Sequence, residues 1–181
     1  HSEGPLVGAI LAGREKQLAF LVLMAGNRVP AGEMLLSRVA AGRERTLLKE
    51  VFSAVQAPGR ETAVRALQAR FSEEELAPYL TPWMRTLLSI DPQAVLRQVR
   101  CPVLALIGDK DLVVRADANI PALTQALAAN SYARVERLPG LNHFFQTART
   151  GEFSEVEGIR ETMSPRALEL IGNWALQQPA R

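Results

Sequence analysis

Residues 101–114, CPVLALIGDKDLVV, decide the fold class of this chain. Cys101-Pro102 introduces an unbroken apolar run over residues 103–107, which ends at Gly108 and is followed by two aspartates. A continuous apolar run of this length is typical of a strand that is buried on both faces, as in a parallel sheet. The polar loop after the run would then lie at the carboxyl end of the strand, where parallel sheets place their functional sites.

Further strands and helices are predicted on both sides of this stretch. Residues 18–25, LAFLVLMA, form a second continuous apolar run, and residues 133–138 alternate in the manner of a strand nearer the sheet edge. Three helices are predicted beside these strands, over residues 5–14, 116–129 and 164–177. Strands that alternate with helices indicate parallel pairing through crossover connections, so the expected fold class is α/β with three parallel strands and flanking helices.

Residues 30–88 have a different pattern, because apolar side chains recur at helical spacing and no strand is predicted among them. Ser72 followed by three glutamates indicates a helix start, and Thr81-Pro82 indicates another. We therefore expect three parts, in which residues 1–29 and 89–181 form the sheet core and residues 30–88 form a helical block. This block either covers the sheet as a structural element or acts as a cap over a cleft.

The composition limits the classes of function. The 181 residues include 21 basic and 19 acidic side chains, and the two signs are interspersed, which gives no electrostatic footprint for a nucleic-acid partner. Cys101 is the only cysteine, so no internal disulfide can form. No apolar stretch reaches the ~18 residues of a membrane span. A phosphate cradle, a zinc cluster and a dinucleotide fingerprint are also missing from the sequence, so no cofactor is expected, and the compartment stays open.

The first four residues, His1-Ser2-Glu3-Gly4, match a G-x-S-x-G nucleophile elbow that lacks its first glycine. This pattern makes Ser2 a candidate catalytic serine. In such an elbow the backbone N–H of the residue after the nucleophile, here Glu3, donates to the oxyanion of the transition state. The second oxyanion donor normally comes from a loop after an early strand, and no part of this sequence is expected to provide it.

A serine hydroxyl needs a base that takes its proton, and the base needs an acid that orients it. Only two histidines are available. His1 is expected to point away from the site because the elbow projects Ser2 alone, which leaves His143, in the loop after the third strand, as the candidate base. Asp111, in the loop after the central strand, is the candidate acid, whereas Asp109 is expected to hold the turn or stay in solvent. The chain order serine, aspartate, histidine is the one that α/β-hydrolases use.

These motifs together resemble the carboxyl-terminal half of a bacterial α/β-hydrolase, in the serine esterase branch related to dienelactone hydrolases and serine-aminopeptidase-like lipases. The resemblance spans essentially all 181 residues and is carried by HSEG, TPWMRTLLSIDPQAVLRQVRCPVLALIGDKDLVV, LPGLNHFFQTA and TMSPRALELIGNWALQQ, in that order. It implies a hydrolase that cleaves small-molecule carboxylic esters through an acyl-enzyme, without a cofactor. Ser2 would be the nucleophile, Asp111 the acid and His143 the base.

The resemblance also implies that residues 30–88 are a cap inserted after the sixth strand of the family's sheet. The sequence departs from the family in two respects. Pro5 stands where a further glycine is usual, and the first five strands, the leading glycine of the elbow and the upstream oxyanion loop are absent. The chain is therefore expected to be N-terminally truncated and, by itself, weakly active or inactive.

Two alternatives stay open at this point. A peptidase or a thioesterase uses the same triad, so the sequence does not separate either of them from an esterase. A truncated half-domain could instead be non-catalytic, with residues 18–25 as a bare apolar sheet edge that favours self-association.

Overall fold

The computed structural model describes residues 1–26, 28–37 and 39–178. The chain divides into two compact units, one made of His1–Arg28 and Pro92–Arg181 and the other of Val29–Asp91. The three parts expected from the sequence include residues 27, 38 and 179–181, which lie outside the described residues. Each unit has its own hydrophobic core.

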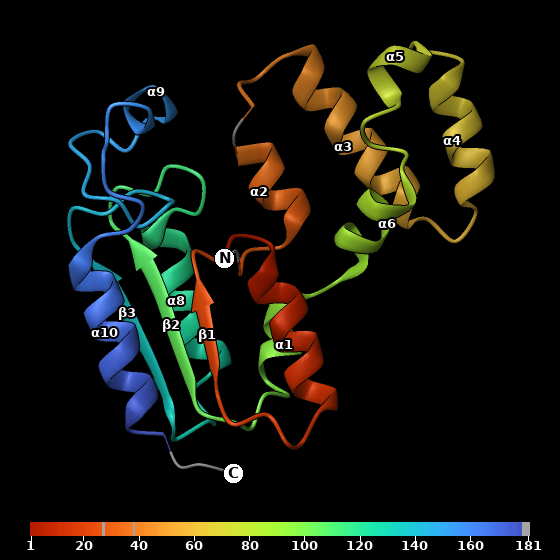
Figure 1. Cartoon of the computed structure of the whole chain (residues 1–181). Helices are drawn as coiled ribbons and strands as arrows, with labels where there is room; N and C mark the ends of the chain where they lie inside the picture. Colours follow the sequence, from red (N-terminus) through yellow and green to blue (C-terminus); the bar gives the residue numbers. More distant parts are fainter. Residues whose placement is uncertain (27, 38, 179–181) are drawn as a thin grey trace. The chain divides into compact units, whose positions relative to one another are not determined.

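The first unit is built on a three-stranded parallel sheet, as predicted (Figure 1). The strands are β1 (Leu21–Met24), β2 (Val103–Gly108) and β3 (Ala133–Leu138), in the order β1-β2-β3. Leu23 pairs with Ala105, and Ala105 pairs with Val135. All six residues of β2 are buried, which confirms that the apolar run of the central strand has no solvent-facing side.

Helices cover both faces of this sheet. They are α1 (Gly4–Arg14), α7 (Pro92–Leu96), α8 (Ala116–Ala126) and α10 (Pro165–Leu176), whereas the short helix α9 (Phe153–Val156) contributes no residue to either core cluster. Val103, Ala105 and Ile107 of β2 pack in one cluster with residues of α1, α7 and α8. Leu104 and Leu106 pack on the opposite face with residues of α10, including Trp174. Alternate side chains of one strand therefore join two cores, because successive residues of a strand point to opposite faces.

Several boundaries differ from the sequence-based expectations. The strand predicted over residues 18–25 is shortened at both ends to β1, and its carboxyl end is fixed by the backbone, which becomes left-handed at Ala25, where φ is 50°. The helix predicted over residues 5–14 is α1, which begins one residue earlier, and its Val7 and Leu11 side chains are about half exposed. The helix predicted over residues 164–177 is α10, which begins at Pro165, and the side chain of the preceding Ser164 makes no capping hydrogen bond.

The second unit is entirely helical in the residues that the structure describes. Its helices are α2 (Ala31–Ser37), α3 (Arg43–Gln56), α4 (Arg60–Gln68), α5 (Glu73–Leu76) and α6 (Pro82–Ser89). The core of the unit includes Val51, Phe52 and Leu76. Both predicted helix starts are confirmed: Ser72 forms a capping box with Glu75, and the Thr81 side chain accepts a hydrogen bond from a backbone N–H of α6.

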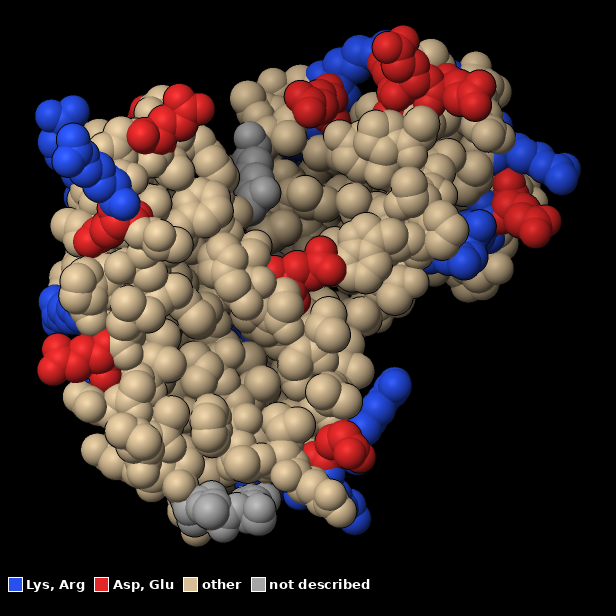
Figure 2. Space-filling view, in the orientation of Figure 1, with Lys and Arg blue, Asp and Glu red and all other residues tan. Residues whose placement is uncertain are grey.

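Charged side chains of both signs are interspersed over the visible face of the described residues in Figure 2. Among the helices of the described residues, none has the length and apolar character that crossing a membrane requires.

Candidate active site

Ser2 lies in a tight turn that leads into α1 and is hydrogen-bonded to the last residue of β1. Its backbone N–H donates to the carbonyl of Met24 at 2.9 Å, and the Gly4 N–H donates to the carbonyl of His1 at 3.0 Å. The φ angle of Ser2 is 60°, a left-handed conformation that is uncommon for a residue with a side chain. Strained backbone of this kind is often found at functional sites, where the surrounding structure holds it in place.

Glu3 is the residue that immediately precedes α1. Its backbone N–H therefore belongs to the first unpaired donors of an 11-residue helix, where the helix dipole favours negative charge. This position suits the oxyanion donor that the elbow motif predicts, and the assignment stays a prediction.

Asp111 lies in the loop that follows β2, and it is 3% exposed. Its Oδ1 accepts hydrogen bonds from the backbone N–H groups of Val113 at 2.8 Å and Val114 at 2.7 Å. Its Oδ2 lies 2.9 Å from Nδ1 of His143. Asp109, by contrast, accepts a hydrogen bond from the backbone N–H of Gly140 at 2.6 Å and so holds a turn, one of its two expected roles.

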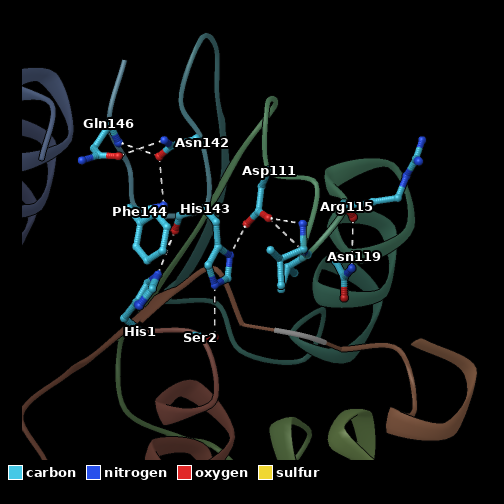
Figure 3. A network of polar contacts seen from close by, with 11 residues as sticks. His1, Ser2, Asp111, Arg115, Asn119, Asn142, His143, Phe144 and Gln146 are labelled. Carbon is cyan, nitrogen blue, oxygen red and sulfur yellow. Dashed lines mark hydrogen bonds and ion pairs between the residues drawn. The ribbon is translucent and has the colours of Figure 1, made fainter. Parts of the chain in front are cut away.

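His143 lies in the loop after β3 and is positioned between the other two residues (Figure 3). Its Nδ1 faces Asp111, and its Nε2 lies 3.1 Å from Oγ of Ser2. A carboxylate only accepts hydrogen bonds, so Nδ1 carries the proton and Nε2 presents a lone pair to the serine hydroxyl. The fold thus brings the three candidate residues, which are far apart in sequence, into one hydrogen-bonded relay.

The expectation that His1 points away from the site is wrong. The Nε2–H of His1 donates to the backbone carbonyl of His143 at 2.8 Å, and the two imidazole rings have centroids 4.8 Å apart. The contact joins residues 142 positions apart, so no local sequence signal could have revealed it. His1 thereby fixes the backbone of the loop that carries the candidate base.

A buried amide pair in the histidine loop was also missed from the sequence. Oδ1 of Asn142 accepts the backbone N–H groups of Phe144 and Gln146, both at 3.0 Å, and its Nδ2 donates to Oε1 of Gln146 at 3.0 Å. Phe145, which lies inside this turn, has a left-handed φ of 61°. An asparagine directly before the histidine was a signal for such a turn, because its side chain readily bonds to the backbone two residues on.

No group of three or more histidine, cysteine, aspartate or glutamate side chains that could hold a metal ion occurs among the described residues.

The three-dimensional structure resembles several solved proteins, although no protein-family model matches the sequence and no curated protein is significantly similar to it. Rv0554 from Mycobacterium tuberculosis matches with a TM-score of 0.50 and 18% identity over 99% of this chain and 64% of that one. The A129V mutant of the meta-cleavage product hydrolase CumD matches with a TM-score of 0.49 and 15% identity over 98% of this chain and 63% of that one. The esterase RhEst1 from Rhodococcus sp. ECU1013 matches with a TM-score of 0.47 and 18% identity over 98% of this chain and 64% of that one. The chain therefore spans less than two thirds of the length of these proteins.

Proposed function

Because the chain has the core of an α/β-hydrolase fold, we propose that it carries the catalytic triad of a serine hydrolase that cleaves carboxylic esters, with Ser2 as nucleophile, His143 as base and Asp111 as acid. The observation that carries this proposal is the continuous relay from Oδ2 of Asp111 through the imidazole to Oγ of Ser2, with separations of 2.9 and 3.1 Å. These separations are within the hydrogen-bonding range that proton transfer requires.

The first half of the reaction would be acylation. Oγ of Ser2 attacks the ester carbonyl carbon while Nε2 of His143 takes the hydroxyl proton, and Asp111 stabilises the resulting imidazolium. The negative charge on the former carbonyl oxygen is held by the backbone N–H of Glu3. When the tetrahedral intermediate collapses, the bond to the alcohol oxygen breaks and the imidazolium returns its proton to that oxygen, which leaves an acyl-serine.

Deacylation would use the same groups on water. Nε2 of His143 takes a proton from a water molecule, whose oxygen attacks the acyl carbon, and the proton then passes to Oγ of Ser2 as the acid product leaves. The buried position of His143 and Asp111, which are 7% and 3% exposed, keeps competing solvent hydrogen bonds away from the relay.

The helical unit Val29–Asp91 is proposed to act as the cap that the family resemblance implies. A peptidase or a thioesterase would use the same relay, and the ester assignment follows the resemblance to the esterase branch. Relative rates on an ester, a thioester and an amide substrate separate these three reactions.

The test is hydrolysis of p-nitrophenyl acetate, an acyl-CoA thioester and an aminoacyl p-nitroanilide by the chain and by its Ser2→Ala variant. Ser154→Ala, at an exposed serine of α9, is the matched control. Because the relay needs the hydroxyl of Ser2 as its nucleophile, we expect ester turnover that the Ser2→Ala change abolishes and Ser154→Ala keeps. Turnover that survives Ser2→Ala, or no turnover at all, would contradict catalysis by this chain, and a faster amide or thioester reaction would contradict the ester assignment.

A further inference from the structure

Arg28, close after the end of β1, has a buried guanidinium group without a visible counterpart. The residue is 0% exposed, and its Nε, Nη1 and Nη2 atoms have no hydrogen-bond partner among the described residues. Arginine is almost never fully buried unless it is paired, because an uncompensated charge inside a protein is strongly destabilising. Burial lowers the pKa of this guanidinium only to about 10, so it is still a cation at neutral pH. A bound anion would compensate the buried positive charge of Arg28.

The backbone of Arg28 is anchored beside the loop of the candidate acid. Its N–H donates to Oδ1 of Asn119 at 2.6 Å, and Nδ2 of Asn119 donates to the carbonyl of Arg115 at 3.0 Å. Both partners belong to the start of α8, the helix that follows the Asp111 loop (Figure 3). The main chain at Arg28 is consequently anchored to the helix that directly follows the loop of the candidate acid.

The side chain of Arg28 lies beside the elbow that carries Ser2. A Cβ atom placed on Gly26 would lie 2.9 Å from Nη2 of Arg28 and 2.5 Å from Cβ of Pro5. Pro5 is in the first turn of α1, three residues after the serine, and the Ser2 N–H is bonded to the end of β1. The guanidinium and Pro5 of α1 therefore both lie against Gly26, and a side chain at position 26 would clash with both of them.

We propose that Arg28 anchors an anion subsite next to Ser2, and that its ligand is a carboxylate group carried by the substrate. The planar guanidinium offers several N–H donors in a fixed fork, which matches the two oxygens of a carboxylate. That the carboxylate belongs to the substrate rests on the proposed function, whereas anion binding at Arg28 does not. The protein would accordingly prefer esters that carry a free carboxylate over neutral esters of the same size.

The first experiment measures binding without using activity. The thermal midpoint of the chain is recorded with acetate, succinate, phosphate or chloride at matched ionic strength, for the wild type and for Arg28→Met. An anion at about fivefold its Kd should raise the midpoint of a chain of this size by roughly 2–4 °C. We expect acetate or succinate to do so in the wild type and not in Arg28→Met. Arg115→Met, at an exposed arginine of the same region, should keep the effect.

The sign of the substitution without added carboxylate separates an anion subsite from a structural role. In chloride, without a carboxylate, the buried guanidinium of the wild type has no partner and destabilises the folded chain. Arg28→Met removes this unpaired charge, so the thermal midpoint of the variant should be higher than that of the wild type. A lower midpoint of Arg28→Met under every condition would show that Arg28 is structural and would overturn the proposal. A carboxylate effect that persists in Arg28→Met, or an effect of phosphate alone, would also overturn it.

Gly26→Ala provides a second variant in case Arg28→Met fails to fold. The added methyl group would lie 2.9 Å from Nη2 of Arg28 and 2.5 Å from Cβ of Pro5, so both the guanidinium and the first turn of α1 have to shift while the arginine itself remains. The carboxylate effect should therefore be lost. Retention of the full effect in Gly26→Ala would contradict the position assigned to the guanidinium.

A kinetic experiment tests the link to the substrate. It compares kcat/KM for mono-p-nitrophenyl succinate with kcat/KM for the neutral p-nitrophenyl butyrate. We expect the ratio to fall at least tenfold in Arg28→Met, and an unchanged ratio would overturn the assignment of the carboxylate to the substrate. If carboxylates stabilise the wild type but neither ester is turned over, the proposed function fails and the anion subsite stands.

Discussion

Replacing Asp111 with asparagine should disable the relay while leaving the fold in place. Oδ1 of Asp111 accepts hydrogen bonds from two backbone N–H groups. In Asp111→Asn the amide oxygen has to take the place of Oδ1, because an NH2 group there would face two hydrogen-bond donors. The NH2 group is then forced to point at Nδ1 of His143, where Oδ2 now lies at 2.9 Å. A donor at that place requires Nδ1 to be the acceptor, which moves the imidazole proton to Nε2.

The magnitude follows from this change of tautomer. An Nε2 that carries a proton donates to Oγ of Ser2 and cannot take the hydroxyl proton. In a serine protease triad the same substitution lowers kcat by about 10⁴-fold, which corresponds to roughly 5.4 kcal/mol of transition-state stabilisation. Because both backbone bonds to Oδ1 survive, the thermal midpoint of Asp111→Asn should stay close to that of the wild type.

The assay is the rate of p-nitrophenol release from p-nitrophenyl acetate, together with the rate of covalent labelling by a fluorophosphonate, which reports the reactivity of the serine itself. Asp109→Asn is the matched control, because Asp109 lies two residues away and only holds a turn. Its rates should remain within about threefold of the wild type, as expected for a residue outside the relay. A loss of less than tenfold in Asp111→Asn, with an intact fold, would refute the assignment of Asp111 as the acid.

Two further predictions concern the loops around the site. Gly108→Ala should be strongly destabilising, because its Cβ would lie 2.1 Å from the backbone carbonyl oxygen of Leu141, just before the candidate base. The control is Gly172→Ala in α10, whose Cβ would meet nothing within 4 Å and which should be neutral or stabilising by up to about 1 kcal/mol. Equal thermal midpoints for the two variants would contradict this packing. Glu155 has its pKa lowered to about 2, first by the side-chain hydroxyl of Thr150 and then by backbone N–H groups of the same loop. Its contribution to stability should therefore be present above pH 4.5 and be lost as the pH falls toward 2, and Glu155→Gln should flatten the dependence of the thermal midpoint on pH in this window; an unchanged pH profile would contradict the assigned contacts.

The central strand and the helix starts could be predicted because their signals are local or continuous. Residues 103–107 are apolar without interruption, and the structure needs this because alternate side chains of β2 join cores on both faces. The capping box at Ser72 involves a partner only three residues away. The relay residues could be selected because each loop follows a strand and only two histidines were available.

The features that sequence reasoning missed depend on contacts between distant segments. Arg28 is fully buried, and its backbone N–H is bonded to Asn119, 91 positions away, whereas arginine in a sequence normally indicates an exposed position. The contact of His1 with the carbonyl of His143 likewise exists only after the sheet has formed. The left-handed backbone at Phe145 has no propensity signal, since a bulky residue disfavours that conformation and tertiary packing imposes it here.

The most direct test of the triad is the site of covalent modification by a fluorophosphonate. Trypsin should release residues 1–14, HSEGPLVGAILAGR, a peptide in which Ser2 is the only hydroxyl side chain. We predict a stoichiometric mass increase on this peptide, which is abolished by Ser2→Ala and strongly slowed by His143→Ala. Labelling that is absent from this peptide, or that proceeds equally fast without the imidazole, would contradict the account.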